Sequence, residues 1–294
     1  MAVIELTSAH NPLLKVVRLV ATRSRRAPAE LVLAEGLRIL EEAAASGHAI
    51  TAAILSEGFG STPRQQALVE TWSAAGVRMY RAGAKVLRSV SAVLEPQGAV
   101  ALVRVPATRL AYVARAPRAD VLCACGLQDP GNLGTLIRTA AAAGCSLFCT
   151  TPGTVSARNP KAVRASAGAF FRLAVAEGIT PGKILDFSRE HGLRLFRTDA
   201  HLGQDCFKAD LRSPFVLLVG NEAHGFDANV WSELPPLRVP MAPGVESLNV
   251  SAAGAVILFE ALRQRCSTAG SQELPGDAHT ADHRTESGHE FSVS

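Results

Sequence analysis

The chain has 294 residues, of which 48% are hydrophobic and 19% are charged, a composition typical of a globular protein. This length allows one large domain or two modest ones, each able to bury a core. No run of about 18 uncharged apolar residues predicts a transmembrane helix. Residues 1–10 lack the basic region and apolar stretch of a signal peptide, so a cytoplasmic protein is expected.

The net charge of +4 is unevenly distributed along the chain. Residues 1–118 carry 15 lysines and arginines against 8 acidic residues, residues 119–265 carry 14 against 13, and residues 266–294 carry 1 against 5. A basic first segment is compatible with a polyanionic partner such as nucleic acid. A solvated charged surface would give the same pattern, so charge alone leaves both interpretations open.

The first 105 residues alternate helix and strand signals and predict a compact α/β domain. Apolar residues at helical spacing predict a helix over residues 11–24, and a second helix is expected over residues 35–46, closed by Gly47. Apolar runs predict strands over residues 31–34, 50–55, 77–80 and 99–105. Residues 106–118 contain two prolines and three arginines without a sustained apolar pattern, and they predict a linker.

A second α/β unit is expected over residues 119–265. Its strand candidates are residues 121–127, 146–150, 193–198, 215–219 and 237–241, and a last helix is expected over residues 248–265. Strands that alternate with helices predict a largely parallel sheet covered on both faces, which binds ligands beyond the carboxyl ends of its strands. The tail, residues 266–294, has almost no apolar residues and is expected to be disordered.

The six cysteines point to buried, reduced thiols rather than to a metal centre. Cys123 and Cys125 alternate within an apolar strand candidate, and no second CxxC or paired histidine completes a zinc site. Histidines in the tail are loosely spaced, so a solvated tail fits them better than a metal site. No metal is expected.

The first of three polar clusters comprises residues 127–140, directly after a predicted strand. Asp129, Pro130 and Gly131 predict a turn, and the alanine-rich stretch from residue 132 to 144 predicts a helix. The side chains of Asn132 and Arg138 can converge if Asn132 lies in the turn and Arg138 projects from the second helical turn. An arginine in such a helix is more often a surface charge than a functional residue, so Arg138 taken alone is weak evidence.

The other two clusters also follow strand candidates. Gly220 ends the strand over residues 215–219, and the next loop presents Glu222 between glycines, which allow close approach of the backbone to a ligand. In the third cluster, Ser247 or Asn249 could cap the last helix and leave backbone N–H groups facing a ligand. Either residue could also be a helix cap and nothing more.

Together the three clusters resemble the motifs of the SpoU (TrmH-type) branch of the SPOUT methyltransferases. DPxNxGxxxRTA matches residues 129–140, the second motif matches residues 219–226, and the third matches residues 239–251, in the family order. The first segment is similar to the family's ribosomal-protein-like α/β substrate-binding domain at residues 7–12, 35–38 and 97–99. The resemblance implies an S-adenosylmethionine-dependent RNA ribose 2′-O-methyltransferase whose parallel-sheet domain forms a trefoil knot.

The resemblance also implies the residues of the site. The cofactor-binding residues would be Gly220, Val239, Met241, Ala242 and Leu248. Arg138 is expected beside the ribose 2′-hydroxyl, where a guanidinium would stabilise the developing alkoxide because it seldom acts as a base. The residues expected to orient Arg138 and the nucleotide are Asn132, Glu222, Ser247 and Asn249. Family members act as homodimers with the site at the subunit interface.

The basic first segment would bind the RNA. Its candidates for phosphate contacts, which position RNA without reading its sequence, are Arg23, Arg25, Arg26 and Arg38. With two Trp and two Tyr in the chain, few aromatic platforms are available for stacking bases, so recognition by shape is expected. Large-subunit ribosomal RNA is the expected substrate, and transfer RNA is the alternative.

Other protein classes agree less well with the sequence. A non-catalytic RNA-binding protein would not need Asn132, Arg138, Glu222 and Asn249 together. A P-loop nucleotidase would carry a GxxxxGK[ST] run, which is absent. A Rossmann-type methyltransferase would carry a GxGxxG turn followed by an acidic ribose-binding residue, which is also absent.

Overall fold

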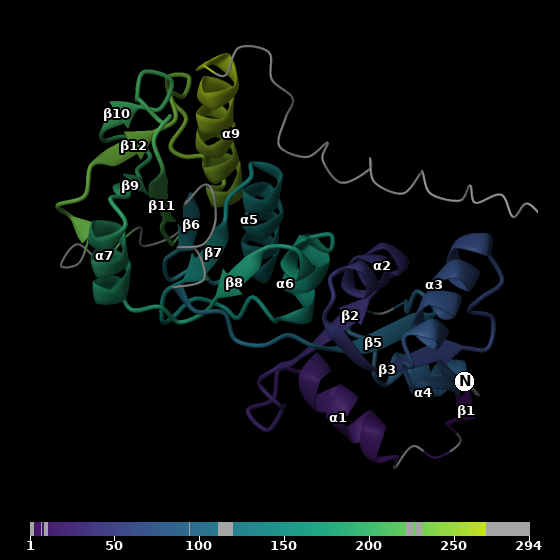
Figure 1. Ribbon diagram of the computed structural model, residues 1–294. Coiled ribbons are helices and arrows are strands. Elements are labelled where there is room, and N and C mark those ends of the chain that lie inside the picture. Colours follow the sequence, from purple (N-terminus) through teal and green to yellow (C-terminus); the bar gives the residue numbers. More distant parts are fainter. Residues whose placement is uncertain are drawn as a thin grey trace, which may run out of the picture.

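Two β-sheets, each with its own helices, make up the described part of the computed structural model, which comprises residues 3–6, 8, 11–93, 95–110, 120–221, 226 and 231–268 (Figure 1). The first lobe contains β1 (Ile4–Glu5), α1 (Pro12–Ala21), β2 (Leu31–Glu35), α2 (Leu37–Ala45), β3 (Ala49–Ser56), α3 (Pro63–Ala74), β4 (Met79–Ala82), α4 (Ala84–Arg88) and β5 (Ala99–Arg104). The second lobe contains β6 (Val121–Ala124), α5 (Pro130–Ala142), β7 (Leu147–Thr150), α6 (Pro160–Ala165), η2 (Ala169–Phe171), β8 (Ala174–Ala176), α7 (Pro181–Glu190), β9 (Arg194–Thr198), β10 (Gln204–Asp205), β11 (Phe215–Val219), β12 (Pro236–Arg238) and α9 (Val250–Thr268).

The first lobe has a mixed five-stranded sheet in the order β1-β4-β3-β5-β2, in which β5 runs antiparallel to β2 and β3. The four strands predicted for this segment are confirmed. The sequence did not indicate β1, because it has only two residues, both exposed, and it pairs with β4 at the edge of the sheet. The predicted first helix is confirmed as α1, which Asn11 caps and which buries Leu14, Val17 and Val20.

The second lobe has a seven-stranded sheet in the order β10-β12-β9-β11-β6-β7-β8, and every pairing within it is parallel. Alternate residues of the central strands pack on opposite faces. Leu122 and Leu217 face the side covered by α5 and α9, whereas Val121 and Val216 face the side covered by α7 (Figure 1). The predicted parallel sheet covered on both faces is confirmed, and it directs the loops after β9, β11 and β12 to one edge.

Helix boundaries differ from the prediction in both lobes, and in the first lobe α1 ends at Ala21 instead of residue 24 while α2 begins at Leu37 instead of residue 35. Asp129 accepts a hydrogen bond from the backbone N–H of Asn132 (2.7 Å) and caps α5, so the helix begins at Pro130 and Asn132 lies inside its first turn. The last helix, α9, continues to Thr268, three residues past the predicted boundary. Cys266 is therefore helical rather than part of a disordered tail, and residues 269–294 lie outside the described residues.

The two lobes share one apolar core. A single cluster of buried side chains includes Ile39 and Ala43 of α2 together with Ala169 and Phe170 of η2. Arg158 adds a polar connection, because its guanidinium donates to the backbone carbonyl oxygens of residues 105 (2.9 Å) and 106 (3.3 Å) at the start of the predicted linker. Residues 111–119 of that linker lie outside the described residues.

All six cysteines are free thiols. Five are buried, namely Cys123, Cys125, Cys145, Cys149 and Cys206, as expected for reduced core thiols. Cys266, on α9, is exposed. Within the described ranges, none of the helices has the length and apolar character needed to cross a membrane.

Candidate active site

A cavity of about 620 Å³ lies where β9, β11 and β12 end and where α9 begins. Apolar side chains form much of its wall, and a few polar groups come from the strand ends and the start of α9. This volume and this mixture are typical of pockets that hold a small organic ligand. The residues that line the cavity include Arg197, Thr198, Asp199, Gly220, Asn221, Val239, Met241, Ser247, Leu248 and Asn249.

Four of the five residues predicted to bind the cofactor line this cavity. Gly220 follows β11, Val239 and Met241 follow β12, and Leu248 precedes α9. The four come together because the carboxyl ends of parallel strands meet at one edge of the sheet. Ala242 is exposed and is not among the lining residues.

Asn249 connects the first and third motifs. Its side-chain oxygen accepts a hydrogen bond from the backbone N–H of Ser251 (2.9 Å), so of the two predicted candidates, Ser247 and Asn249, it is Asn249 that caps the last helix. Its Nδ2 donates to Oδ1 of Asn132 (3.0 Å) on α5. Asn132 is thereby held beside the cavity, and Ser247 lines the cavity directly.

Arg138 is exposed on α5 and is not among the residues that line the cavity. It is six residues after Asn132, and because Asn132 is helical the two side chains leave the helix on different sides. The turn geometry that would let them converge is therefore absent. No described carboxylate pairs with Arg138. Glu222 lies outside the described residues.

Two charged residues at the end of β9 were not predicted from the sequence. Nη1 of Arg197 donates to Oδ2 of Asp199 (2.7 Å), and Oδ1 of Asp199 accepts from the backbone N–H groups of His201 and Leu202 (3.0 and 2.9 Å). Burial by itself raises the pKa of Asp199, but these donors outweigh it and the pKa lies below its usual value. An ionised carboxylate therefore lines the cavity.

A signal for Asp199 was present in the sequence. The pair Thr198-Asp199 directly follows the strand predicted over residues 193–198. That strand is β9, which pairs with β11 and so ends at the same edge as Gly220. Polar residues after any strand of a predicted parallel sheet should be counted as candidates, including those outside a recognised motif.

The four arginines predicted to contact RNA differ in their surroundings. Arg25 and Arg26, in the loop after α1, are exposed, and so is Arg38 in the first turn of α2. Arg23 is half-buried, and its Nη2 donates to Oγ of Ser156 across the lobe junction (3.2 Å). Burial lowers the pKa of Arg23. Arg23 therefore helps to join the lobes, whereas the other three present their charge at the surface.

Comparison with known proteins gives matches over both lobes. The family model of the SpoU rRNA methylase family matches residues 120–259, which contain the cavity. The model of the MRM3-like substrate binding domain matches residues 11–101, which form most of the first lobe.

Relatives of similar length align over nearly the whole chain. An uncharacterized tRNA/rRNA methyltransferase of Synechocystis is 32% identical over 88% of this chain and 94% of its own length. The 23S rRNA (guanosine(2553)-2′-O)-methyltransferase RlmP of Bacillus subtilis is 29% identical over 87% of this chain and 98% of its own. The crystal structure of an AdoMet-bound rRNA methyltransferase from Sinorhizobium meliloti has a TM-score of 0.77 at 28% identity, covering 89% of this chain and 98% of that chain.

Proposed function

Because the chain belongs to the SpoU rRNA methylase family, we propose that it transfers a methyl group to a ribose 2′-oxygen of large-subunit ribosomal RNA. It is an S-adenosylmethionine-dependent RNA methyltransferase. The observation that carries the proposal is the cavity at the ends of β9, β11 and β12, where residues from two separate motifs meet. The similarity to RlmP, named as a 23S rRNA enzyme, supports ribosomal over transfer RNA.

The residues of the cavity fit S-adenosylmethionine. Val239, Met241 and Leu248 offer an apolar wall for an adenine ring, and the backbone at Gly220 is free of a side chain that would hold the ring away. The ionised Asp199 suits the hydroxyl or ammonium groups of the cofactor. When bound, the cofactor supplies an electrophilic methyl group on a positively charged sulfur.

The chain's own residues would then activate and orient the ribose. For transfer to occur, the ribose 2′-hydroxyl would have to be held in line with the methyl group and lose its proton, and a nearby cation would stabilise the negative charge that develops on the 2′-oxygen. Arg138 would supply this cation and anchor a phosphate. The residues that would orient the nucleotide are Asn132, Glu222, Ser247 and Asn249, of which Asn132 and Asn249 are already joined by a hydrogen bond.

The proposal includes a division of the chain and an assembly. Residues 1–105 would bind RNA, and residues 106–118 would be the linker. Residues 119–265 would form a knotted methyltransferase domain with Ala242 at the cofactor. A tail would follow α9, which ends at Thr268. The protein would act as a cytoplasmic homodimer with the site at the subunit interface. The exposure of Arg138 outside the cavity of its own chain supports such an interface, because its charge is accessible to a second chain.

The test is transfer of radiolabelled methyl from S-adenosylmethionine to separated ribosomal and transfer RNA fractions. We expect label in large-subunit ribosomal RNA, recovered after alkaline hydrolysis as a dinucleotide, because a methylated 2′-oxygen cannot attack the adjacent phosphate. Alkali-labile label would contradict methylation at the 2′-oxygen. Label confined to transfer RNA would contradict the choice of substrate.

A further inference from the structure

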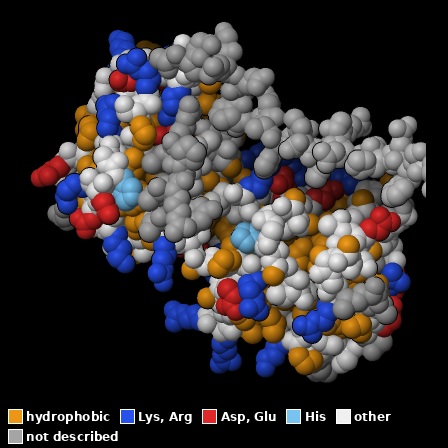
Figure 2. Space-filling view, in the orientation of Figure 1, with side chains coloured by type: hydrophobic (Ala, Val, Ile, Leu, Met, Phe, Trp, Pro, Cys, Tyr) orange, Lys and Arg blue, Asp and Glu red, His pale blue; other side chains and the backbone are white. Residues whose placement is uncertain are grey.

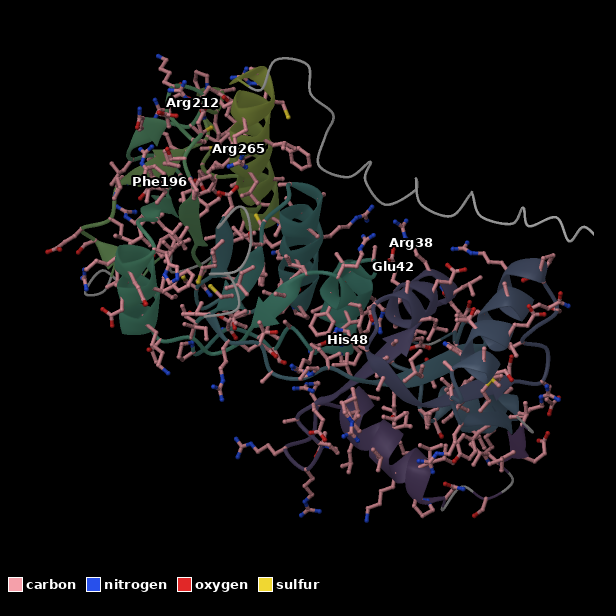
Figure 3. All side chains as sticks on the ribbon, viewed as in Figure 1. Arg38, Glu42, His48, Phe196, Arg212 and Arg265 are labelled. Carbon is pink, nitrogen blue, oxygen red and sulfur yellow. The ribbon has the colours of Figure 1, made fainter. Side chains whose placement is uncertain are left out.

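A second cavity, of about 270 Å³, lies at the junction of the two lobes. It shares no lining residue with the cofactor cavity. Its walls come from the start of α2, the segment before β5 and the end of α6, and they comprise Glu35, Gly36, Arg38, Ile39, Val93, Gln97, Arg164 and Ala167. Figure 3 labels Arg38, which lies near the junction of the two lobes.

Two guanidinium groups from different lobes line this cavity. Arg38 comes from the first lobe and Arg164 from the second. Nη1 of Arg164 is buried and makes no hydrogen bond with any described residue. A buried donor without a partner costs about 1–3 kcal/mol, so its presence indicates a missing acceptor.

The nearby carboxylates are already engaged. Glu35 accepts hydrogen bonds from the Ser91 hydroxyl and from the backbone N–H of Ala92 (3.0 Å). Glu42, one helical turn after Arg38, pairs with Arg172 across the junction (3.4 Å). Figure 2 shows basic and acidic side chains together in the notch between the lobes. Among the described residues, no ion pair neutralises Arg38 or Arg164, so two guanidinium groups face one lining carboxylate, that of Glu35.

The backbone around the cavity also favours an anion. Gly36 precedes α2 with a φ of +97°, and no side chain caps the helix, so the first-turn N–H groups lack a side-chain acceptor. Gln97 lies close to Gly36, where an added Cβ would come within 2.9 Å of its Oε1. Ala167 has a φ of +50°, a conformation that is strained for a residue with a Cβ and that is often found at ligand sites.

The position of the cavity relative to the active site is fixed by close packing. Arg164 is on α6, and α6 packs directly against α5 at Gly134, where an added Cβ would come within 2.2 Å of the carbonyl oxygen of Ala162. Helix α5 carries Asn132 and Arg138. A ligand held in this cavity is therefore positioned relative to the site of methyl transfer.

We propose that this cavity binds one backbone phosphate of the RNA, held by Arg38, Arg164 and the first-turn N–H groups of α2. Guanidinium groups bind phosphate oxygens through paired, charge-assisted hydrogen bonds. The inference rests on the proposed function, because the RNA substrate supplies the phosphate. A phosphate bound by both lobes would fix which ribose of the RNA on the first lobe reaches the site of methyl transfer.

The test is the salt dependence of the binding of large-subunit ribosomal RNA by the full chain and three variants. Arg38→Gln and Arg164→Gln should each reduce the slope of log K against log salt by about 0.7–0.9, the value for one phosphate. The double variant should reduce it no further, because both side chains hold the same phosphate. Arg189→Gln is the matched control, since its 78% exposed side chain lies on α7, away from the cavity.

Further measurements separate binding from folding. Arg38 is exposed, so its replacement should leave the fold intact, and Arg164→Lys should retain most of the slope because it keeps the charge. Cofactor affinity should be unchanged in every variant. If Arg38→Gln and Arg164→Gln both match Arg189→Gln in slope, the phosphate site is overturned.

Inorganic phosphate distinguishes a free anion from RNA. If it raises the melting temperature of the RNA-free protein but not of Arg164→Gln, while the RNA slopes stay unchanged, the cavity holds a free anion and the RNA assignment is overturned. Normal methylation with unchanged slopes would overturn this inference alone. A wild-type protein that neither binds nor methylates RNA would overturn the proposed function, and this inference with it.

Discussion

Arginine side chains are paired with carboxylates in much of the second lobe, whereas several in the first lobe are exposed. In the second lobe Arg265 binds Asp120 (2.6 Å), and Arg158 binds Glu177 (2.9 Å). Among the described residues, the Arg64–Glu41 pair is the one ion pair whose two partners both lie in the first lobe. The exposed arginines without a described carboxylate partner include Arg25, Arg26 and Arg38.

This difference separates two uses of the same side chain. A paired guanidinium is neutralised and fixes the chain, as where Arg197 and Asp199 shape the wall of the cofactor cavity. An unpaired, exposed guanidinium keeps its charge for a phosphate. The near balance of charge in residues 119–265 and the excess of positive charge in residues 1–118 follow the same division. This difference supports the proposed division, in which the second lobe would bind the cofactor and carry out the chemistry and the first lobe would chiefly attract RNA.

The largest expected effect is a loss of folding stability when the buried ion pair between Arg265 and Asp120 is broken. Asp120→Ala leaves Arg265, whose side chain is 8% exposed, without its carboxylate, and an uncompensated buried charge costs about 3–5 kcal/mol. Urea unfolding measures this loss. Asp186→Ala, which breaks a pair whose side chains are 75% and 78% exposed, should change stability by less than about 1 kcal/mol. Equal effects of the two replacements would show that the buried pair has no special structural role.

Replacing the proposed alkoxide stabiliser should have the next largest effect. Arg138→Ala should lower the rate of methyl transfer by about 10²- to 10³-fold, the range found when one donor to a developing oxyanion is removed. Cofactor affinity should be nearly unchanged, because Arg138 does not line the cofactor cavity. Single-turnover transfer and equilibrium cofactor binding measure the two quantities. Full activity in this variant would remove Arg138 from the mechanism.

Neutralising exposed arginines of the first lobe should weaken RNA binding without slowing the chemistry. Arg25→Gln combined with Arg26→Gln should reduce the salt slope of RNA binding by up to about 1.4–1.8, because each arginine contacts at most one phosphate and each phosphate contributes about 0.7–0.9. The transfer rate at saturating RNA should stay the same. An unchanged slope would show that this loop does not touch the RNA backbone.

The hydrogen bonds of Asn249 allow a smaller and more selective test. Asn249→Ala removes the cap of α9 and should cost about 1 kcal/mol, measured by thermal unfolding. Asn249→Asp keeps the oxygen that accepts from Ser251 but loses the donor to Asn132. It should therefore restore stability while still slowing methyl transfer. If both variants are equally destabilised, the cap is not the source of the effect.

The smallest expected effect is a pH dependence that comes from Asp199. Its donors keep its folded pKa below the unfolded value of about 3.9, so its contribution to stability is present above that pH and is lost as the pH falls through the folded pKa. Asp199→Asn should therefore lower the free energy of unfolding at pH 7, and the difference from wild type should shrink below about pH 4. A difference that is constant with pH would show that the charge of Asp199 does not contribute.

The apolar run over residues 215–219 predicted β11 well, and Gly220 follows that fully buried strand. The strand predicted over residues 237–241 has the wrong bounds, because β12 covers Pro236–Arg238 and Val239 follows it. The short strands β1, β8 and β10 escaped prediction, since two or three residues at a sheet edge carry no periodic pattern. The early start of α5 was missed because Asp129-Pro130-Gly131 suits both a turn and a capped first helical turn.

Features that depend on two distant segments could not be predicted from local patterns. The position of Arg164 beside Arg38 depends on how α6 packs on the first lobe, and no spacing in the sequence encodes that arrangement. The bond between Asn132 and Asn249 joins residues 117 positions apart. Arg23 resembled its exposed neighbours in sequence, yet it lies half-buried against Ser156. Such contacts depend on the tertiary structure, within one lobe for Asn132 and Asn249 and between the lobes for the arginines.

The division of labour between the lobes is tested most directly by measuring, on one protein, the salt dependence of binding to ribosomal RNA and to S-adenosylmethionine. We expect a steep slope for RNA that falls when Arg25 and Arg26 are replaced by glutamine, and a nearly flat dependence for the cofactor in both proteins. A salt slope for RNA that is unaffected by these replacements would contradict the account. It would show that RNA is held chiefly by the second lobe.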